Sequence, residues 1–474
     1  MIAATLAAYL LALLAIGIWA QRRVSDSNDF HLAGRALGPV VASLSASASS
    51  SSVWTLLGVS GAAYLWGLSA VWLIPAVICG FAINWFLVAP RLQRDSRGNG
   101  ALTLVEFLAS GCTASMERRI RRLGALLIIF CFSLYVAAQF QGAGTAIAAA
   151  LPVSEGVAIS AGALVVIGYV LLGGFWAASV TDAVQGLMML LVAAVLPAVA
   201  LAAVGGPGEL YAGLAALPDA GAARLVDQPN AWLGALFVAG IFGIGLGYPG
   251  QPHVVNRFMA LRSPGDIGRA RLIALLWAGV IYTGMVLLGW SGRLLIPAAD
   301  DPEAVLLELS LLLLPALVGG IVTGGVLAAI MSTADSQLLV ASGSVSHDLH
   351  RTGRPDGSRG VLTDRLVVLA LGAAAVLLAV FVPESIFARV LFAWQVLGNA
   401  FGPLLLVMLW SGPVAGGYRL AAMACGGGLT ILASFTADAP GDAVERLIPF
   451  AAALAIARLG GRGRHPLNPR GPAD

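Results

Sequence analysis

Two long apolar segments of this chain carry matching interruptions, and these interruptions constrain the fold more than any other feature. One is the serine-rich run 45–52 inside the apolar stretch 40–65, and the other is the glycine- and proline-rich run 243–252 inside 231–252. In hydrocarbon every backbone N–H and C=O must be paired, and each orphan costs several kcal/mol. A membrane helix therefore breaks only where the freed groups face protein, water or a ligand. Two broken helices at corresponding places in two halves are typical of secondary transporters.

The composition places the chain in a membrane. Of its 474 residues 59% are hydrophobic and 11% are charged, less than half the usual charge of soluble domains. We count about thirteen apolar segments of spanning length, which predicts an all-α polytopic membrane protein. The chain has no Lys, so it lacks the lysine of an ATP-binding P-loop, and we expect no ATP partner.

The arginines predict the orientation of the helices. With the N-terminus outside, all arginines except Arg224, Arg293, Arg389 and Arg446 fall in cytoplasmic loops or the tail. The positive-inside rule therefore favours N-out and C-in, which needs an odd number of spans. The basic residues are divided among separate loops, so we expect no nucleic-acid partner. The first segment has basic residues after it and none before it, so it is predicted to be a membrane helix rather than a signal peptide.

The spans divide into two units of five helices. We expect one transporter domain over 1–460: a first helix and loop (1–38), a first repeat (39–204), a second repeat (231–411) and two last helices (412–460), followed by a disordered cytoplasmic tail (461–474). Each repeat begins with an interrupted helix. Because five is odd, the second repeat enters the membrane from the opposite side, which gives inverted repeats.

Two acidic residues are candidates for ion binding. Asp335 lies in the ninth span, and Asp182 opens the sixth, both toward the cytoplasmic face. A charge inside a membrane is costly and marks function, and oxygen ligands suit a hard monovalent cation. Ser332, Thr333 and Ser336 add hydroxyls to this part of the ninth span. The alternative for Asp182 is a simple helix cap at the interface.

Other polar residues have simpler interpretations. Gln139 and Gln141 in the fourth span, like Trp394 and Gln395 in the eleventh, are expected to join helices rather than bind a ligand. Arg257 is interpreted as a cytoplasmic anchor with Arg262, Arg269 and Arg271. The four cysteines show no metal-binding spacing and are expected to be packing residues.

A set of short motifs is ordered along most of the chain. The segments are Asp29-Phe30, Gly34-Arg35-Ala36-Leu37-Gly38, the stretch 45–61 with Trp54-Thr55-Leu56-Leu57-Gly58, Asn84-Trp85, Ala101-Leu102-Thr103-Leu104, Thr181-Asp182-Ala183-Val184-Gln185, Gly245-Leu246-Gly247-Tyr248, Gly250-Gln251-Pro252-His253, Arg257-Phe258-Met259-Ala260, 328–337 and Phe401-Gly402-Pro403. In this order they resemble the sodium/solute symporter family, and within it the bacterial sodium/proline symporters. The resemblance covers about residues 29–412. It implies the LeuT-type five-plus-five inverted-repeat fold with thirteen spans.

The resemblance also implies the binding residues. A sodium ion would lie between the second and ninth spans, bound by the carbonyls of Ala48, Ser51 and Ala329 and the hydroxyls of Ser332 and Thr333. Some members hold a second sodium ion, and the matching residues here are Asp182, Asp335 and Ser336, with Ser332 shared. The substrate positions of the proline transporters correspond to Ser52, Tyr135, Tyr248 and Pro252.

The chain departs from the proline symporters at two positions. Ser50 stands where they carry an Asp needed for sodium, and Ile244 stands where they carry a Trp. The first departure bears on the affinity for the ion or on its identity. The second removes a large aromatic ring from the expected pocket, so it bears on the solute.

These observations predict a symporter, not an enzyme, in the bacterial inner membrane. It would couple sodium, its co-transported ion, to the entry of a small organic solute, with an amino acid such as L-proline as the first candidate. A monocarboxylate or a sugar is the alternative solute, and a proton carried on Asp335 or Asp182 is the alternative ion. A membrane solute sensor and an intramembrane aspartyl enzyme are remote alternatives. The sensors of this family carry fused signalling domains, and the motifs around both aspartates do not fit the enzyme.

Overall fold

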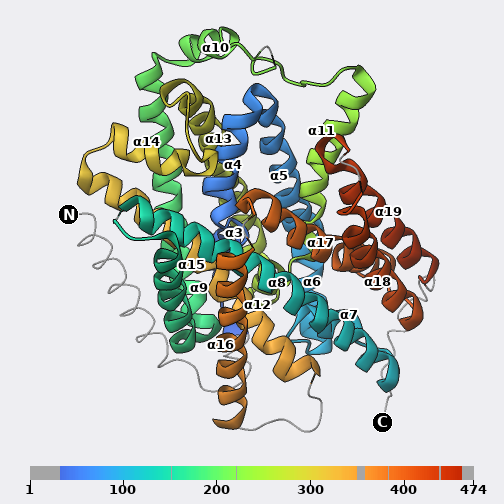
Figure 1. The fold of residues 1–474 in the computed structure, drawn as a ribbon. Coiled ribbons are helices and arrows are strands. Elements are labelled where there is room, and N and C mark those ends of the chain that lie inside the picture. Colours follow the sequence, from blue (N-terminus) through green and yellow to red (C-terminus); the bar gives the residue numbers. More distant parts are fainter. Residues whose placement is uncertain are drawn as a thin grey trace, which may run out of the picture.

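The part of the chain that the structure describes is built from helices. The computed structural model describes residues 32–150, 152–219, 221–349, 358–382, 384–436 and 439–461. Within these ranges the chain forms helices and two isolated bridges, Leu37 with Leu261 and Val414 with Gly461, and no strand (Figure 1). The first predicted span and nearly all of the predicted tail lie outside the described residues.

The first predicted interruption is confirmed, but the break is narrower than the serine run. Helix α3 (Pro39–Ser50) includes most of the serines and ends at Ser51, whose backbone leaves the helical region at φ −117° and ψ 78°. The chain continues as η2 (Trp54–Gly58), α4 (Val59–Trp66), η3 (Gly67–Trp72), α5 (Leu73–Ala82), η4 (Ile83–Val88) and α6 (Ala89–Asn99). Serine is compatible with a buried helix because its hydroxyl can bond back to the backbone, as Ser43 does to Val40.

The second interruption is also confirmed. Helix α11 (Ala231–Leu246) ends at the glycines, a short turn η5 (Tyr248–Gly250) follows, and α12 (Pro252–Ala260) begins on a proline. Proline is suited to a first helical turn because its missing N–H would have no partner there. Helix α12 packs against α3, so the second half of one broken helix lies against the first half of the other.

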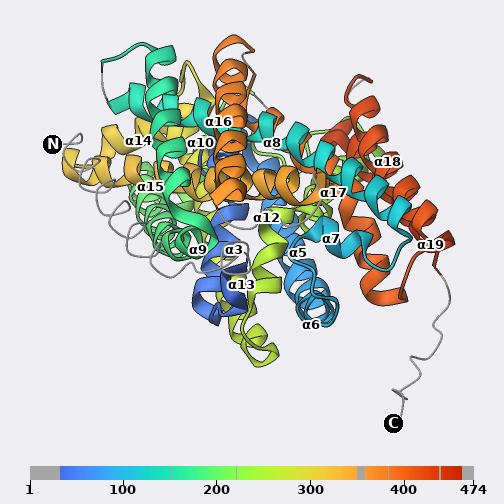
Figure 2. The same ribbon diagram turned by 90° about the horizontal axis from the view of Figure 1, so that it is seen from below.

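The remaining helices pack around the two broken helices. They are listed in chain order: α7 (Leu104–Ala109), α8 (Ala114–Ala150), α9 (Glu155–Val204), α10 (Pro207–Ala215), α13 (Ile267–Leu295), α14 (Val305–Leu313), α15 (Ala316–Gly343), α16 (Ser358–Phe381), α17 (Ile386–Ser411), α18 (Gly416–Ala433) and α19 (Ala443–Leu459), with the short turns η1 (Ala33–Arg35), η6 (Pro264–Asp266), η7 (Pro302–Ala304), η8 (Ser344–Leu349) and η9 (Pro440–Asp442). Figure 2 shows α16 lying across α8 and α15.

Two predicted boundaries differ from the structure. Helix α9 runs over Glu155–Val204, and the apolar segment of spanning length within it begins at Ala178, so Asp182 lies in the first turns of that segment and does not open a helix. The polar residues near Asp182 looked like a boundary, but they are buried against other helices. The ninth segment is divided at Leu314 and Pro315 into α14 and α15, because proline does not fit a helix interior.

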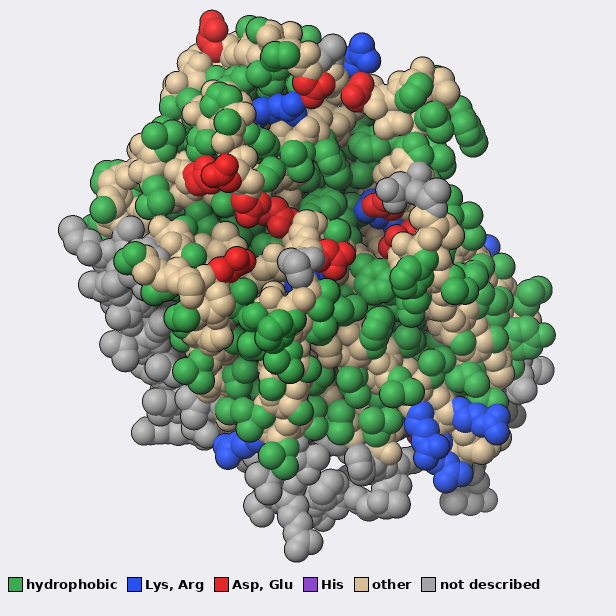
Figure 3. Space-filling model, viewed as in Figure 1, with side chains coloured by type: hydrophobic (Ala, Val, Ile, Leu, Met, Phe, Trp, Pro, Cys, Tyr) green, Lys and Arg blue, Asp and Glu red, His purple; other side chains and the backbone are tan. Residues whose placement is uncertain are grey.

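Seven segments within the described residues are long and apolar enough to cross a membrane. They are Trp54–Asn99, Ala114–Ala149, Ala178–Val204, Ala231–Gly250, Pro264–Leu295, Ala316–Gly343 and Ile386–Ser411. Figure 3 shows hydrophobic side chains over the middle of one face, with acidic groups mainly above them and a basic patch at the lower right, near α7 in Figure 1. A helical, multi-pass membrane protein is therefore confirmed, whereas the total of thirteen spans stays a prediction.

One arginine joins three segments near α7. Arg121 of α8 forms ion pairs with Glu106 at 2.9 Å, Glu117 at 3.2 Å and Asp348 at 3.3 Å. Asp348 lies in η8, directly after α15, and its side chain is fully buried. Three carboxylates therefore face one guanidinium. Burial raises the pKa of Asp348 to about 8, with Arg121 opposing the shift and Glu106 adding to it.

This arrangement predicts a pH-dependent stability. Since the pKa of Asp348 is raised on folding, the folded state holds a proton that the unfolded chain has lost, from about pH 4 up to about pH 8. The stability that Asp348 contributes is therefore complete below pH 4 and declines as the pH rises toward 8. Asp348→Asn should flatten this decline and raise the unfolding temperature most above pH 8. Thermal unfolding in detergent between pH 5 and about 9 measures it, and equal slopes for both proteins would contradict it.

Candidate functional site

The backbone groups released by the first break bond to side chains. The amide of Val53 donates to Oε1 of Gln139 at 3.1 Å, and the amide of Trp54 donates to Oγ of Ser52 at 3.1 Å. Gln139 comes from α8 and is fully buried. The predicted joining role of this glutamine is therefore confirmed, and its target is the broken backbone itself.

The second break is held in the same way, but through its carbonyls. Trp394 donates its indole N–H to the carbonyl of Ile244 at 3.1 Å, and Gln395 donates to the carbonyl of Gly243 at 3.2 Å. Asn84 donates to the carbonyl of Tyr248 at 3.2 Å. Helix α17 thus pairs the free carbonyls of the last turn of α11, and η4 pairs the carbonyl of Tyr248 in the break itself.

Three of the residues predicted to bind sodium, Ala48, Ala329 and Ser332, come together where α15 crosses the end of α3, and Thr333 lies beside them. Oγ of Ser332 lies 3.3 Å from the carbonyl oxygen of Ala48 and 3.1 Å from that of Ala329. Oγ1 of Thr333 lies 3.2 Å from the carbonyl oxygen of Ser49. Ser51 ends α3 and donates its amide to the carbonyl of Ala48 at 3.1 Å. Neutral oxygens from two helices therefore converge, which is the chemistry that a hard cation requires.

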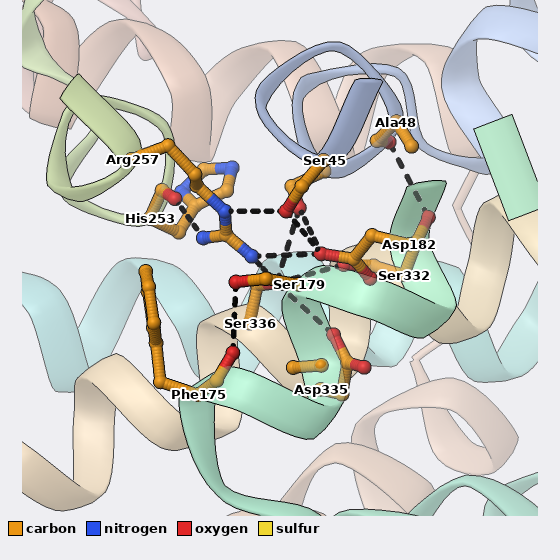
Figure 4. Close-up of polar contacts among 12 residues, drawn as sticks. Ser45, Ala48, Phe175, Ser179, Asp182, His253, Arg257, Ser332, Asp335 and Ser336 are labelled. Carbon is orange, nitrogen blue, oxygen red and sulfur yellow. Dashed lines mark hydrogen bonds and ion pairs between the residues drawn. The ribbon is translucent and has the colours of Figure 1, made fainter. Parts of the chain in front are cut away.

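A fully buried ion pair lies one helical turn away, and Figure 4 shows its two side chains pointing toward each other. Oδ2 of Asp182 accepts bonds from Ser45 at 2.8 Å, Ser49 at 3.1 Å and the guanidinium of Arg257 at 2.9 Å. Arg257 also bonds to Ser45 at 3.0 Å, to Ser336 and to the carbonyl of His253. Neither side chain of the Asp182–Arg257 pair is exposed at all.

Asp335 completes this group of charges. Its Oδ1 accepts a bond from Ser336 at 3.0 Å, and Asp182 and Arg257 lie within its electrostatic reach. Oδ2 of Asp335 and Oδ1 of Asp182 are buried without a hydrogen-bond partner. Buried polar atoms are normally paired, so two orphaned carboxylate oxygens mark a place that favours positive charge. We call Asp182, Arg257 and Asp335 the buried charge cluster.

The predicted substrate residues lie around the two breaks. Tyr135 donates its hydroxyl to Ser52 at 3.2 Å, and the hydroxyl of Tyr248 lies 3.4 Å from that of Tyr282. Tyr282 of α13 also reaches Thr55 at 3.0 Å. Pro252 follows the second break directly and is buried. The structure thus brings Ser52 to Tyr135, and it joins Tyr248 to the first break through a tyrosine that sequence reasoning missed.

Arg257 is the main correction to the predicted site. It was expected in a cytoplasmic loop, but it lies in α12, where its neighbours Val255 and Phe258 are buried as well. The sequence around it is ambiguous, because Val254, Val255, Phe258 and Met259 are apolar whereas His253 and Asn256 are polar. A buried charged residue in a membrane segment is a functional candidate, and Asp182 supplies its partner.

Comparison with known proteins identifies the family. The sequence profile of the sodium:solute symporter family matches residues 30–425. This chain belongs to that family. It is 34% identical over 454 residues to the osmoregulated proline transporter of Bacillus subtilis, covering 94% of this chain and 91% of the relative. It is 32% identical over 421 residues to a sodium/proline symporter of Staphylococcus aureus, covering 86% and 81%.

Solved structures support the fold. A Na+-coupled sialic acid symporter in a substrate-bound outward-open state aligns with a TM-score of 0.79 at 17% identity, over 98% of both chains. A nucleobase-cation-symport-1 transporter in a closed conformation aligns with a TM-score of 0.59 at 13% identity, over 92% of this chain and 94% of the other. The predicted transporter fold is therefore confirmed. As a member of its family, the chain is a sodium-coupled solute symporter and not an enzyme.

Proposed function

We propose that this symporter carries L-proline, or a close relative of it, together with sodium across a bacterial inner membrane. The observation that carries the proposal is the convergence of Ala48, Ala329, Ser332 and Thr333 oxygens at the broken end of α3. Proline is inferred as the solute because relatives of this chain are proline transporters.

The proposed sodium site uses five residues. The carbonyls of Ala48, Ser51 and Ala329 and the hydroxyls of Ser332 and Thr333 would bind the ion and hold α3 against α15. The neighbouring substrate position would be formed by Ser52, Tyr135, Tyr248 and Pro252. Because sodium would order the break that lines this position, each ligand should tighten the binding of the other by the same factor.

The second cation position is formed by Asp182, Asp335 and Ser336. Its two orphaned carboxylate oxygens support a positive charge there, either a second sodium ion or a charge belonging to the protein.

The two departures from the proline symporters are compatible with this reading. The hydroxyl of Ser50 donates to the carbonyl of Ser47 at 2.9 Å, so it closes the last turn of α3 without bringing a charge. Near Ile244 an aromatic ring is present after all, because Trp394 packs on Tyr248 with ring centroids 4.7 Å apart. A small cyclic solute could still meet an aromatic wall.

The proposed topology has thirteen spans, the N-terminus outside and the C-terminus inside, with repeats over 39–204 and 231–411. On this topology α10 and η7 lie outside. Glu303 of η7 accepts bonds from the amides of Ile386 at 2.9 Å and Phe387 at 2.8 Å, which caps α17. Phe387 packs on Trp54 and Trp66 with ring centroids 5.6 and 5.3 Å apart. These contacts would close the outer approach to the break.

Uptake of labelled proline into proteoliposomes, with and without an inward sodium gradient at fixed pH, tests this proposal. One sodium ion crossing 100 mV supplies about 2.3 kcal/mol, enough for roughly 40- to 50-fold accumulation. Sodium-dependent accumulation is expected. Sodium-dependent stabilisation of the protein without proline uptake would overturn proline as the solute. Uptake driven by a pH gradient alone would mean that the coupled ion is a proton and not sodium.

A further inference from the structure

The ionisable side chains near the proposed sodium site carry a small net charge. Within the described residues, the buried charge cluster contains two carboxylates, Asp182 and Asp335, and one guanidinium, Arg257. Other buried arginines have partners elsewhere: Arg121 pairs with Glu106 and Glu117, and Arg446 pairs with Asp442. With both aspartates ionised, the cluster therefore carries one net negative charge.

The cluster is connected directly to the sodium ligands. Ser336 bonds to Arg257, to Asp335 at 3.0 Å and to the carbonyl of Ser332 at 2.9 Å. Ser49 bonds to Asp182 at 3.1 Å through its hydroxyl, while its carbonyl accepts from Thr333 at 3.2 Å. The sodium ligands themselves are uncharged. One sodium ion next to the cluster would thus bring the buried charge to zero, and a second would leave it positive.

From this geometry we infer that Arg257 is a tethered cation that takes the place of a second sodium ion, so that the transporter binds one sodium ion per chain. This inference rests on the proposed sodium site and deepens it. Arg257 is suited to the task because its guanidinium is always charged and donates several bonds in a fixed plane. It already bonds to Asp182 and Ser336, two of the three residues of the second cation position, and to the neighbouring Ser45.

Direct binding of radioactive sodium to the purified full-length chain tests the inference without knowledge of the solute. The wild type and Arg257→Lys should bind one sodium ion per chain, because lysine keeps the charge. Arg257→Met leaves two uncompensated carboxylates and should bind two. Arg257→Met with Asp182→Asn has one net negative charge again and should return to one. Arg271→Met is the matched control, because Arg271 bonds to the carbonyl of Trp85 and lies apart from the cluster.

The outcomes separate this inference from the proposed function. Two sodium ions on the wild type, or one on both the wild type and Arg257→Met, would overturn the role of Arg257 while leaving sodium binding in place. Absence of saturable sodium binding in the wild type would overturn the sodium site itself. If Arg257→Met does not fold, Asp335→Asn gives the reverse test: a neutral cluster should raise the half-saturating sodium concentration on the order of tenfold, and an unchanged value would contradict the charge count.

Discussion

Removing either hydroxyl that α15 offers to the end of α3 should sharply reduce the response to sodium. Ser332→Ala and Thr333→Ala each remove one predicted ligand and one contact between the helices, at 3.3 Å to Ala48 and 3.2 Å to Ser49. Losing one such interaction costs about 1–3 kcal/mol. We expect the half-saturating sodium concentration for uptake to rise by roughly five- to 150-fold at that cost. Initial uptake rates over a sodium titration measure it.

Two control variants distinguish ligand loss from general damage to the helix. Thr323→Ala removes a buried hydroxyl of the same helix that bonds only to the carbonyl of Gly319 among the contacts described, at 3.1 Å. It should leave the sodium titration unchanged. Thr333→Ser keeps the hydroxyl and should retain most of the response. An unaltered sodium dependence in both Ser332→Ala and Thr333→Ala would remove these residues from the site.

A single methyl group at Gly250 should disturb the second break. A Cβ atom there would lie 2.5 Å from the carbonyl oxygen of Leu397 and 2.6 Å from Cα of Gly398, both on α17. Backbone atoms cannot turn aside as a flexible side chain can, so η5 and α17 must separate. Overpacking of this kind costs typically 1–3 kcal/mol. We expect Gly250→Ala to lower the thermal stability in detergent and to abolish most uptake, since Tyr248 moves with η5.

The matched control is Gly279→Ala. A Cβ atom on Gly279 in α13 meets no atom within 4 Å, and alanine favours a helix over glycine by about 1 kcal/mol. This variant should be at least as stable as the wild type. If Gly250→Ala were equally stable and active, the close approach of η5 to α17 would not describe the working transporter.

The two broken helices and their family could be predicted from local sequence. The Gly243–Tyr248 region combines glycines with a following proline, and these residues interrupt a helix wherever they occur. Ser332, Thr333 and Asp335 lie within one turn of one helix, so their proximity follows from helical spacing alone. The pairing of α15 with α3 was predicted from the resemblance. In the structure the two helices meet where Ser332 donates to the carbonyl of Ala48.

The buried charge cluster was decided by the tertiary structure. Asp182 and Arg257 are separated by 75 residues and lie on helices α9 and α12, and their charges looked compatible with a cap and a loop. An arginine at an interface and an arginine inside a protein have the same local sequence signals, because the difference is whether a carboxylate meets it. Sequence therefore determined where the backbone can break and which oxygens follow, whereas only the packing of distant helices decided which charges face each other in a medium that water does not screen.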